Sequence, residues 1–302
     1  MAREPSPSMY APPPTRARLR NKEYMFALFA AIFVSSSSSD DNSDDGREQA
    51  EGHSSSSNDA GGVAVPSPAY LTKYSPRAVI IESSIIPNLI PLMLHFTTIL
   101  GPSWGIILFT LQDNWIEPLS PAFQRLKTSG HIEIRFLPAD TELSNSHSVS
   151  VFLTSPWIWQ QVELAKRVLL FQSDSILCAK SEAAVDDYFQ YDFLGAPIAP
   201  MYGSGYNGGL SIRNPRMFLQ IVRETDFATS GHEFEDQFFF AELEKRGAEL
   251  PDQNVAKTFS VETIYYETPL GYHQPQRWQA AHMESIEDWC PEVKMLIGRR
   301  AQ

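Results

Sequence analysis

A carboxylate stands just beyond an apolar run in the middle of the chain. Residues 168–171 are Val, Leu, Leu and Phe, which is typical of a buried strand, and Asp174 follows after Gln172 and Ser173. Sheets of α/β proteins place ligands at the carboxyl ends of their parallel strands. Asp174 could therefore bind Mg²⁺ or Mn²⁺, which in turn would hold a diphosphate. Alternatively, Asp174 caps a turn by accepting hydrogen bonds from local backbone N–H groups.

A glycine-rich segment, residues 203–213, lies farther along the chain. Gly205, Gly208 and Gly209 would let the backbone approach a ligand closely. Asn207 adds an amide that can both donate and accept hydrogen bonds. The alternative is an ordinary glycine-rich turn.

Two adjacent acids, Glu235 and Asp236, begin a predicted helix. Successive helical residues are about 100° apart, so both carboxylates cannot point at one reacting atom. One could act as a general base while the other bonds locally or faces solvent. Alternatively, the two acids only stabilise the positive end of the helix dipole.

His273 stands two residues before Pro275 in a segment rich in Gly and aromatic residues, which predicts a constrained loop. The imidazole could ligate a metal or bond a phosphate. A structural histidine with satisfied hydrogen bonds is an equally good interpretation.

Alternating strands and helices must position these residues. Apolar runs predict strands at residues 78–81, 105–109, 131–136 and 168–171. Capping residues and apolar periodicity predict helices at 88–100, 123–129, 155–167, 214–224 and 235–246. Strands that alternate with helices on short connections indicate an α/β fold with a mostly parallel sheet flanked by helices. Beyond residue 190 the alternation weakens, and the loops are rich in Gly, Tyr and Pro, as is typical of a substrate site.

The body of the chain is acidic. The 302 residues carry a net charge of −12, of which −9 falls on residues 60–302. This charge argues against a sequence-independent nucleic-acid binder, so we expect no nucleic-acid partner. To bind an anionic ligand, this acidic chain would need a local source of positive charge, such as a metal ion or a helix N-terminus. Cys178 and Cys290 are too few for a disulfide scaffold or a four-cysteine zinc site, and leave one disulfide or two free thiols open.

The first 75 residues differ in composition from the rest. Residues 1–23 form a basic tail expected to be disordered, and residues 35–75 form a Ser/Asp-rich linker. Residues 24–34, an apolar run of 11 residues after a basic flank, are typical of a signal or signal-anchor segment. They predict the secretory pathway: a secreted protein, or a type II membrane protein of the ER or Golgi anchored through this segment with its body in the lumen. An internal apolar stretch within the tail is the alternative.

Taken in order, these segments resemble the GT-A glycosyltransferases. They also closely resemble a largely fungal family of domains of unknown function that is grouped with those enzymes. The resemblance covers about residues 76–298. It rests on residues 152–157, 171–178, 191–200, 206–211, 235–238 and 261–273.

The resemblance implies a donor site. GT-A enzymes follow a strand with Asp-x-Asp, whose last acid binds the divalent metal of a nucleotide sugar. In this chain Gln172 replaces the first acid, so Asp174 carries over as a metal ligand and Gln172 could bond ribose or sugar hydroxyls. His273 matches the late histidine that often completes the metal site, and Glu82 lies where the family contacts the nucleotide base. The implied cofactor is Mn²⁺ or Mg²⁺.

The resemblance also implies an acceptor site. Asn207, Gly208 and Gly209 would border the acceptor and the donor sugar. The pair Glu235 and Asp236 matches the position of the catalytic base in many inverting members. Helical spacing lets only one of the two face the site, and Asp236 is the preferred base.

We therefore expect residues 76–298 to form one GT-A-like domain. Its expected activity is metal-assisted transfer of a sugar, as by a hexosyltransferase, from a nucleotide diphosphate sugar to a glycan or other hydroxyl acceptor. The alternative is a non-catalytic nucleotide-sugar or glycan-binding protein, which the missing first acid favours. A phosphodiester hydrolase that uses the same metal pocket is a third interpretation.

Overall fold

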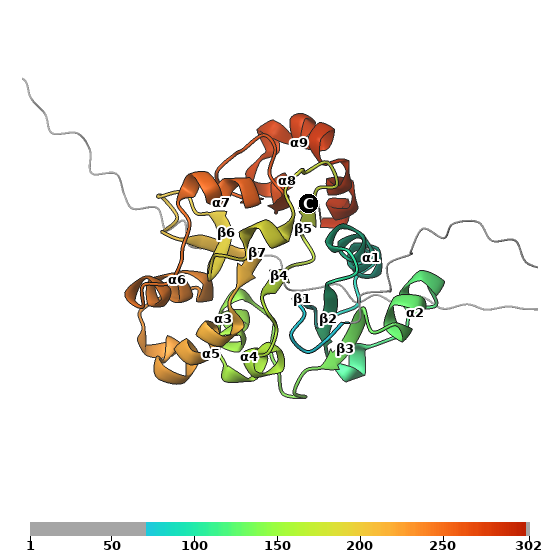
Figure 1. Cartoon of the computed structure of the whole chain (residues 1–302), viewed down its shortest axis with the longest axis horizontal. Coiled ribbons are helices and arrows are strands. Elements are labelled where there is room, and N and C mark those ends of the chain that lie inside the picture. Colours follow the sequence, from blue (N-terminus) through green and yellow to red (C-terminus); the bar gives the residue numbers. More distant parts are fainter. Residues whose placement is uncertain (1–70, 300–302) are drawn as a thin grey trace, which may run out of the picture.

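A six-stranded sheet forms the centre of the protein. The computed structural model describes residues 71–299 (Figure 1). The strand order is β3-β2-β1-β4-β7-β6. Four strands pair in parallel: β3 (Ile132–Phe136), β2 (Gly105–Thr110), β1 (Arg77–Ile81) and β4 (Val168–Phe171). The last two pairings, of β4 with β7 (Tyr206–Arg213) and of β7 with β6 (Phe193–Pro197), are antiparallel.

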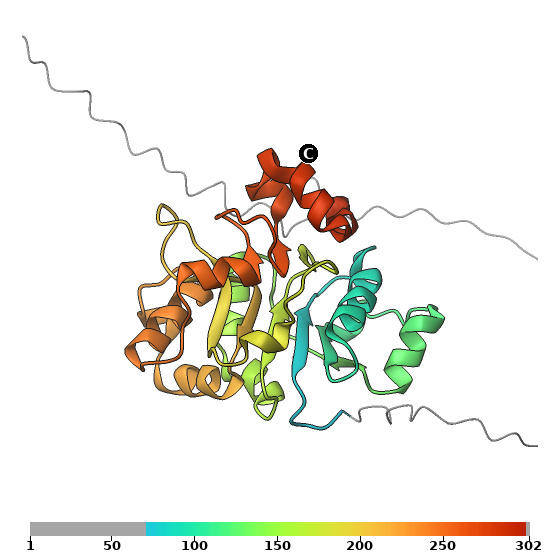
Figure 2. The ribbon, with the colours of Figure 1, turned by 45° about the horizontal axis from the view of Figure 1, so that its top comes forward.

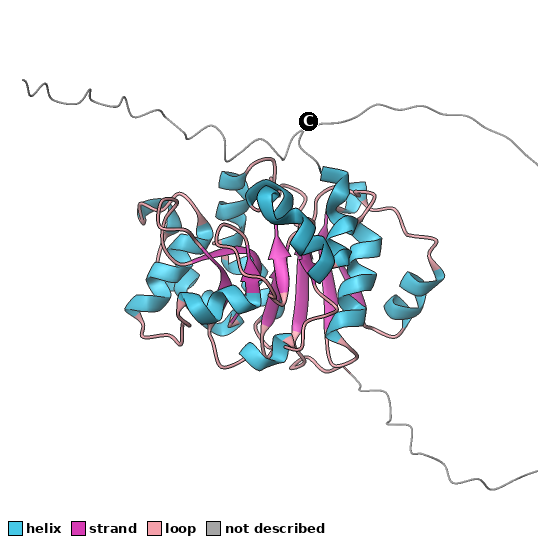
Figure 3. Cartoon of the chain, turned by 90° about the horizontal axis from the view of Figure 1, so that it is seen from above, coloured by secondary structure: helices cyan, strands magenta, loops and turns pink. Residues whose placement is uncertain are grey.

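The parallel strands are apolar because both faces of the sheet are covered. All residues of β2 and β4 are buried. Helices lie on both sides of the strands (Figure 3). The structure confirms the predicted α/β class with a mostly parallel sheet flanked by helices.

The described residues form nine α-helices. They are α1 (Leu89–Leu100), α2 (Pro121–Thr128), α3 (Ser146–Leu153), α4 (Pro156–Val162), α5 (Pro215–Glu224), α6 (Glu235–Lys245), α7 (Gln253–Phe259), α8 (Pro275–Trp278) and α9 (Met283–Trp289). Of these, α2, α3, α5 and α7 begin at a residue whose side chain caps the helix. Short 3₁₀ helices lie at Gln112–Asn114, Val185–Tyr188, Phe227–Thr229, Ala280–His282 and Pro291–Arg299. Helix α1 ends where predicted, at Gly101, whose φ of 75° favours glycine.

Helix α4 is shorter than predicted, and helices α3, α7, α8 and α9 were not predicted. Helix α4 ends at Val162 instead of continuing to residue 167, because the chain turns there toward β4. In this turn the Ala165 N–H donates to the Val162 carbonyl (2.9 Å). Helix α3 is absent from the prediction because its Ser and Val residues have low helix propensity. A capping box begins this helix: the Ser148 N–H donates to Asn145 Oδ1 (3.0 Å), and the Asn145 N–H donates to Ser148 Oγ (3.1 Å).

A second, three-stranded sheet brings the C-terminal segment to the carboxyl end of β4. Its order is β5 (Ser175–Leu177), β9 (Gly271–His273), β8 (Ser260–Val261). Figure 2 shows the C-terminal helices, in red, grouped at one end of the main sheet. Cys178, directly after β5, forms a disulfide with Cys290, directly after α9. Of the two alternatives for the cysteines, the structure therefore has the disulfide.

Two segments predicted to be loops are strands. Most of the glycine-rich segment forms β7, which lies between β4 and β6, instead of a turn. His273 is the last residue of β9 and pairs with Ser175 of β5, instead of lying in a loop. Both strands depend on partners distant in sequence, so the local composition did not predict them.

The predicted basic tail (1–23), the signal or signal-anchor segment (24–34) and most of the predicted linker (35–75) lie outside the described residues. The last part of that linker, residues 71–75, is described and forms a turn that leads into β1. Within residues 71–299, no helix is long and apolar enough to cross a membrane.

Candidate functional site

Asp174 lies between β4 and β5, at the carboxyl end of the parallel strands. Gln274 holds it twice: its side-chain Nε2 donates to Asp174 Oδ2 (2.9 Å), and its backbone N–H donates to the Asp174 carbonyl (3.0 Å). Among the described non-glycine residues, only Gln274 has a positive φ, 48°. Such a conformation persists where the surrounding contacts impose it, and here those contacts orient the Asp174 carboxylate.

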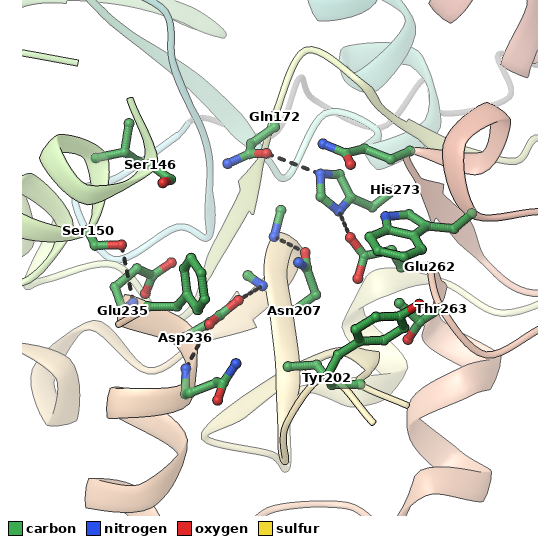
Figure 4. A pocket seen from close by; sticks show the side chains of 18 of the residues that line it. Ser146, Ser150, Gln172, Tyr202, Asn207, Glu235, Asp236, Glu262, Thr263 and His273 are labelled. Carbon is green, nitrogen blue, oxygen red and sulfur yellow. Dashed lines mark hydrogen bonds and ion pairs between the residues drawn. The ribbon is translucent and has the colours of Figure 1, made fainter. Parts of the chain in front are cut away.

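The buried imidazole of His273 lies among the side chains of Gln172, Asp174 and Glu262, and Figure 4 shows its contacts with Gln172 and Glu262. Its Nε2 is 3.1 Å from Gln172 Oε1 and 3.5 Å from Asp174 Oδ1. Its Nδ1 is 3.1 Å from Glu262 Oε1. Burial alone would lower the pKa of His273, but the hydrogen bonds and charges of Asp174 and Glu262 outweigh it and raise this pKa to about 10.

Three of these side chains could hold a divalent cation. Gln172 Oε1, Asp174 Oδ1 and His273 Nε2 converge, and ligands that share an edge of an octahedral Mg²⁺ site are also about 3 Å apart. Glu262 contacts the other ring nitrogen, as the carboxylate behind a metal-bound histidine does. In residues 71–299 no three His, Cys, Asp or Glu side chains gather into a metal site, so an amide would be the third ligand. The set fits a hard cation if the cation displaces the proton of His273.

Glu235 is committed to an ion pair. Arg213 is fully buried at the end of β7, and its two terminal nitrogens each donate to one Glu235 oxygen at 2.9 Å. The guanidinium also donates to Ser211 Oγ (2.9 Å) and to the Gly208 carbonyl (3.2 Å). With this bidentate contact, Glu235 fixes the start of α6 and has no oxygen directed at a reacting atom.

Asp236, its neighbour, turns the other way, toward the cavity (Figure 4). Its Oδ2 accepts from the Gly208 N–H (3.0 Å) and its Oδ1 from the Gln237 N–H (2.7 Å). Burial, and next the charge of Glu235, raise the pKa of Asp236 to about 7. A carboxylate with this pKa is suited to accept a proton near neutral pH.

The glycines of β7 allow this arrangement. A Cβ on Gly208 would collide with the Arg213–Glu235 pair, and a Cβ on Gly209 would collide with the His273 ring. The close approach expected for these glycines is therefore made by side chains of the same chain. Asn207 Oδ1 accepts from the Gly209 N–H (2.8 Å).

Two hollows meet at Gln172. The larger, of about 180 Å³, is lined by seven of the predicted site residues: Gln172, Asn207, Gly208, Gly209, Glu235, Asp236 and His273. The smaller, of about 40 Å³, is lined by Glu82 and Asp174 and shares Gln172 with the first. In it Glu82 accepts from Ser173 Oγ (3.1 Å). Glu82 and Asp174 thus line a different hollow from Asp236, and Gln172 lines both.

The sequence analysis missed four residues of this site: Arg213, Glu262, Gln274 and Trp278. Arg213 is a cation at the end of a mostly buried strand. A buried cation needs a partner of opposite charge, and this requirement was the one local signal for any of the four. The other three line the larger hollow because Glu262 follows β8, Gln274 follows β9 and Trp278 ends α8, and no local pattern predicts where these elements lie.

Comparisons with known proteins give limited matches. No curated protein matches the sequence. The fold is similar to two solved structures of the glycosyltransferase GlyE from Streptococcus pneumoniae TIGR4, one in the apo form. Both are 15% identical and cover 74% of this chain, with TM-scores of 0.43 and 0.42, and the chain spans 63% of the length of each. Residues 131–273, which hold every predicted site residue except Glu82, match a family described as a protein of unknown function (DUF5672).

Proposed function

We propose that this protein is a glycosyltransferase of the GT-A type. It would transfer a sugar from a nucleotide diphosphate sugar to a hydroxyl group of an acceptor. The observation that carries the proposal is one cavity with two unlike walls: Asp236, with a pKa near neutrality, on one wall, and the cluster of Gln172 and His273 on another. A base for the acceptor and a polar end for the donor are the two parts that such a reaction needs.

We assign the donor to the region around Gln172, which lines both hollows. Asp174, Gln172 and His273 would hold Mn²⁺ or Mg²⁺, and such a cation neutralises charge on a leaving diphosphate. Glu82, in the smaller hollow, is placed to bond the nucleoside. Asn207 and the two glycines after it would border the sugar.

Asp236 is the proposed base. In the transfer, the acceptor oxygen forms a bond to the anomeric carbon while the bond from that carbon to the phosphate oxygen breaks. The acceptor proton moves to Asp236, and the diphosphate leaves with the electron pair. The N–H groups of Gly208 and Gln237 hold the carboxylate in place during this step, and the ion pair of Glu235 keeps that second acid out of it.

A binding protein without turnover is the second candidate. Two observations favour it: Gln172 stands where an acid would strengthen metal binding, and both nitrogens of His273 already face side chains. Such a protein would bind a nucleotide sugar or a glycan through the same cavity.

The secretory pathway remains the proposed location, with residues 24–34 as a cleaved signal or membrane anchor. The disulfide between Cys178 and Cys290 supports this proposal, because disulfides persist mainly in oxidising compartments.

Calorimetric titration with UDP- and GDP-sugars tests the donor site. We expect binding that needs Mn²⁺ and that is lost in excess chelator. Asp174→Ala should abolish it, whereas the exposed Asp140→Ala should not. Equal affinity in wild type and Asp174→Ala would contradict the donor site. Binding with neither hydrolysis of the donor nor transfer would favour the binding protein.

A further inference from the structure

Two aromatic side chains form one rim of the larger hollow. Tyr202 lies in the hairpin between β6 and β7, and Trp278 is the last residue of α8. Their rings meet edge to face, with centroids 5.2 Å apart. Tyr202 is 46% exposed, although it lines a cavity that also contains Asp236. The rim therefore presents apolar ring surface to whatever enters the cavity.

The hairpin holds Tyr202 in this position. The Ala199 N–H donates to Thr263 Oγ1 (2.9 Å), and Thr263 Oγ1 donates to the Pro197 carbonyl (3.2 Å). Gly203, with φ of 143°, packs so closely on the Gln237 side chain that a Cβ would clash. Contacts at the base of the hairpin and with α6 thus hold Tyr202 in its exposed position.

Trp278 is held by residues that also contact the proposed metal ligand Asp174. The Arg277 guanidinium lies over its ring, 4.7 Å from the centroid, and donates to Gln274 Oε1 (3.1 Å). Gln274 in turn donates to Asp174. The same short segment therefore orients the proposed metal ligand and one side of the aromatic rim.

The charges in the hollow favour a neutral ligand. Glu235 is paired with Arg213, and Glu262 with His273. Arg277, the cation at the rim, lies over the Trp278 ring and donates to Gln274. Asp236 carries a negative charge above its pKa of about 7, and it would repel a phosphate or carboxylate placed beside it. A ligand that stacks on aromatic rings and also offers hydroxyl groups to carboxylate and amide side chains has the chemistry of a sugar ring.

We propose that Tyr202 and Trp278 form an acceptor subsite that binds a neutral pyranose, with one C–H face of the sugar packed on the rings and a hydroxyl directed at Asp236. This inference rests on the proposed function, because it names the acceptor as a glycan. It assigns the acceptor to the same cavity as the donor, with the segment from Gln274 to Trp278 lying between the aromatic rim and the proposed metal ligand.

Saturation-transfer NMR on the full chain tests the subsite, with methyl α- and β-glucopyranoside, galactopyranoside and mannopyranoside as probes. At least one probe should bind the wild type, and Tyr202→Ala and Trp278→Ala should each weaken its binding by about tenfold. Met201→Ala is the matched control, because Met201 is 80% exposed in the same hairpin and lines no part of the hollow. We expect it to bind like the wild type.

Binding of UDP and GDP in MnCl₂, measured on the same proteins, separates this inference from the proposed function. Nucleotide binding with no pyranoside binding, or with equal pyranoside binding in Tyr202→Ala, overturns the subsite and leaves the transferase proposal standing. Pyranoside binding that Tyr202→Ala weakens, without nucleotide binding, supports the subsite and overturns the transferase. Because Tyr202 is exposed, its variant should keep the wild-type melting temperature, so weaker binding would not reflect unfolding.

Discussion

The two sides of the central sheet are built from different interactions. On the side of β1 to β3 the strands pair in parallel and the interior is almost wholly apolar. On the side of β7 and β6, and in the second sheet, the interior also holds polar and charged groups: of the thirteen buried polar or charged side chains of the described residues, ten come after β4 in the sequence. The buried pair of Arg213 and Glu235 is the clearest case.

This difference separates a scaffold from a site. The parallel side is held by non-directional packing, which tolerates small shifts and supplies most of the stability. The antiparallel side is held by hydrogen bonds and ion pairs of defined direction, which fix where Asp236 and His273 point. Substitutions on the two sides should therefore differ in whether they affect stability or chemistry.

The largest effect is expected from Asp236→Asn. The amide cannot accept the proton of the acceptor, so kcat should fall by about 10²–10⁴-fold while donor affinity is kept. Steady-state kinetics with calorimetry of donor binding measures both. Glu244→Gln, an exposed acid on the same helix, is the control and should behave like the wild type. Wild-type turnover in Asp236→Asn would show that Asp236 is not the base.

The same base predicts a pH profile. Asp236 is protonated below its raised pKa of about 7, and only its deprotonated form can accept a proton. Activity should therefore fall about tenfold per pH unit below 7 and level off above it. A profile that stays flat to pH 5 would contradict this pKa.

Arg213→Met should be the most destabilising change on the antiparallel side. It leaves the Glu235 charge buried without its partner, at a cost of about 3–5 kcal/mol in the free energy of unfolding. Adding Glu235→Leu should recover much of this loss, because an apolar pair replaces the ion pair. Denaturant unfolding of the single and double variants measures the recovery.

Leu108→Ala is the matched change on the parallel side. Leu108 is fully buried in β2, so its truncation should cost about 2–5 kcal/mol. The kcat of this variant per folded molecule should stay near that of the wild type. If Leu108→Ala lowered kcat more than Arg213→Met did, the division into scaffold and site would be wrong.

Reduction of the disulfide should have the smallest effect of these changes. The bond joins residues 112 positions apart and ties the segment after α9 to β5, beside Asp174. Its loss should lower the free energy of unfolding by about 2–4 kcal/mol. Melting with and without reductant measures this, and thiol titration of the unfolded, unreduced protein should find neither Cys178 nor Cys290 free.

The fold could be predicted where local signals decide it. The strands 78–81, 105–109 and 168–171 are apolar runs that suit burial on both faces, and α1, α5 and α6 begin or end at residues that cap helices. The glycine-rich strand β7 could not be predicted in this way. Its two glycines lower strand propensity, and it forms because β4 and β6 pair with it on both sides.

By itself the sequence determined which side chains were candidates, since Asp174, Glu235 and Asp236 stand at the ends of elements that their neighbours specify. Only the tertiary structure decided what each one does. Glu235 is occupied because Arg213, 22 residues away, lies beneath it, and His273 meets Gln172 across 101 residues. A carboxylate's role depends on which charges and donors surround it, and those neighbours come from strands whose pairing the local sequence does not encode.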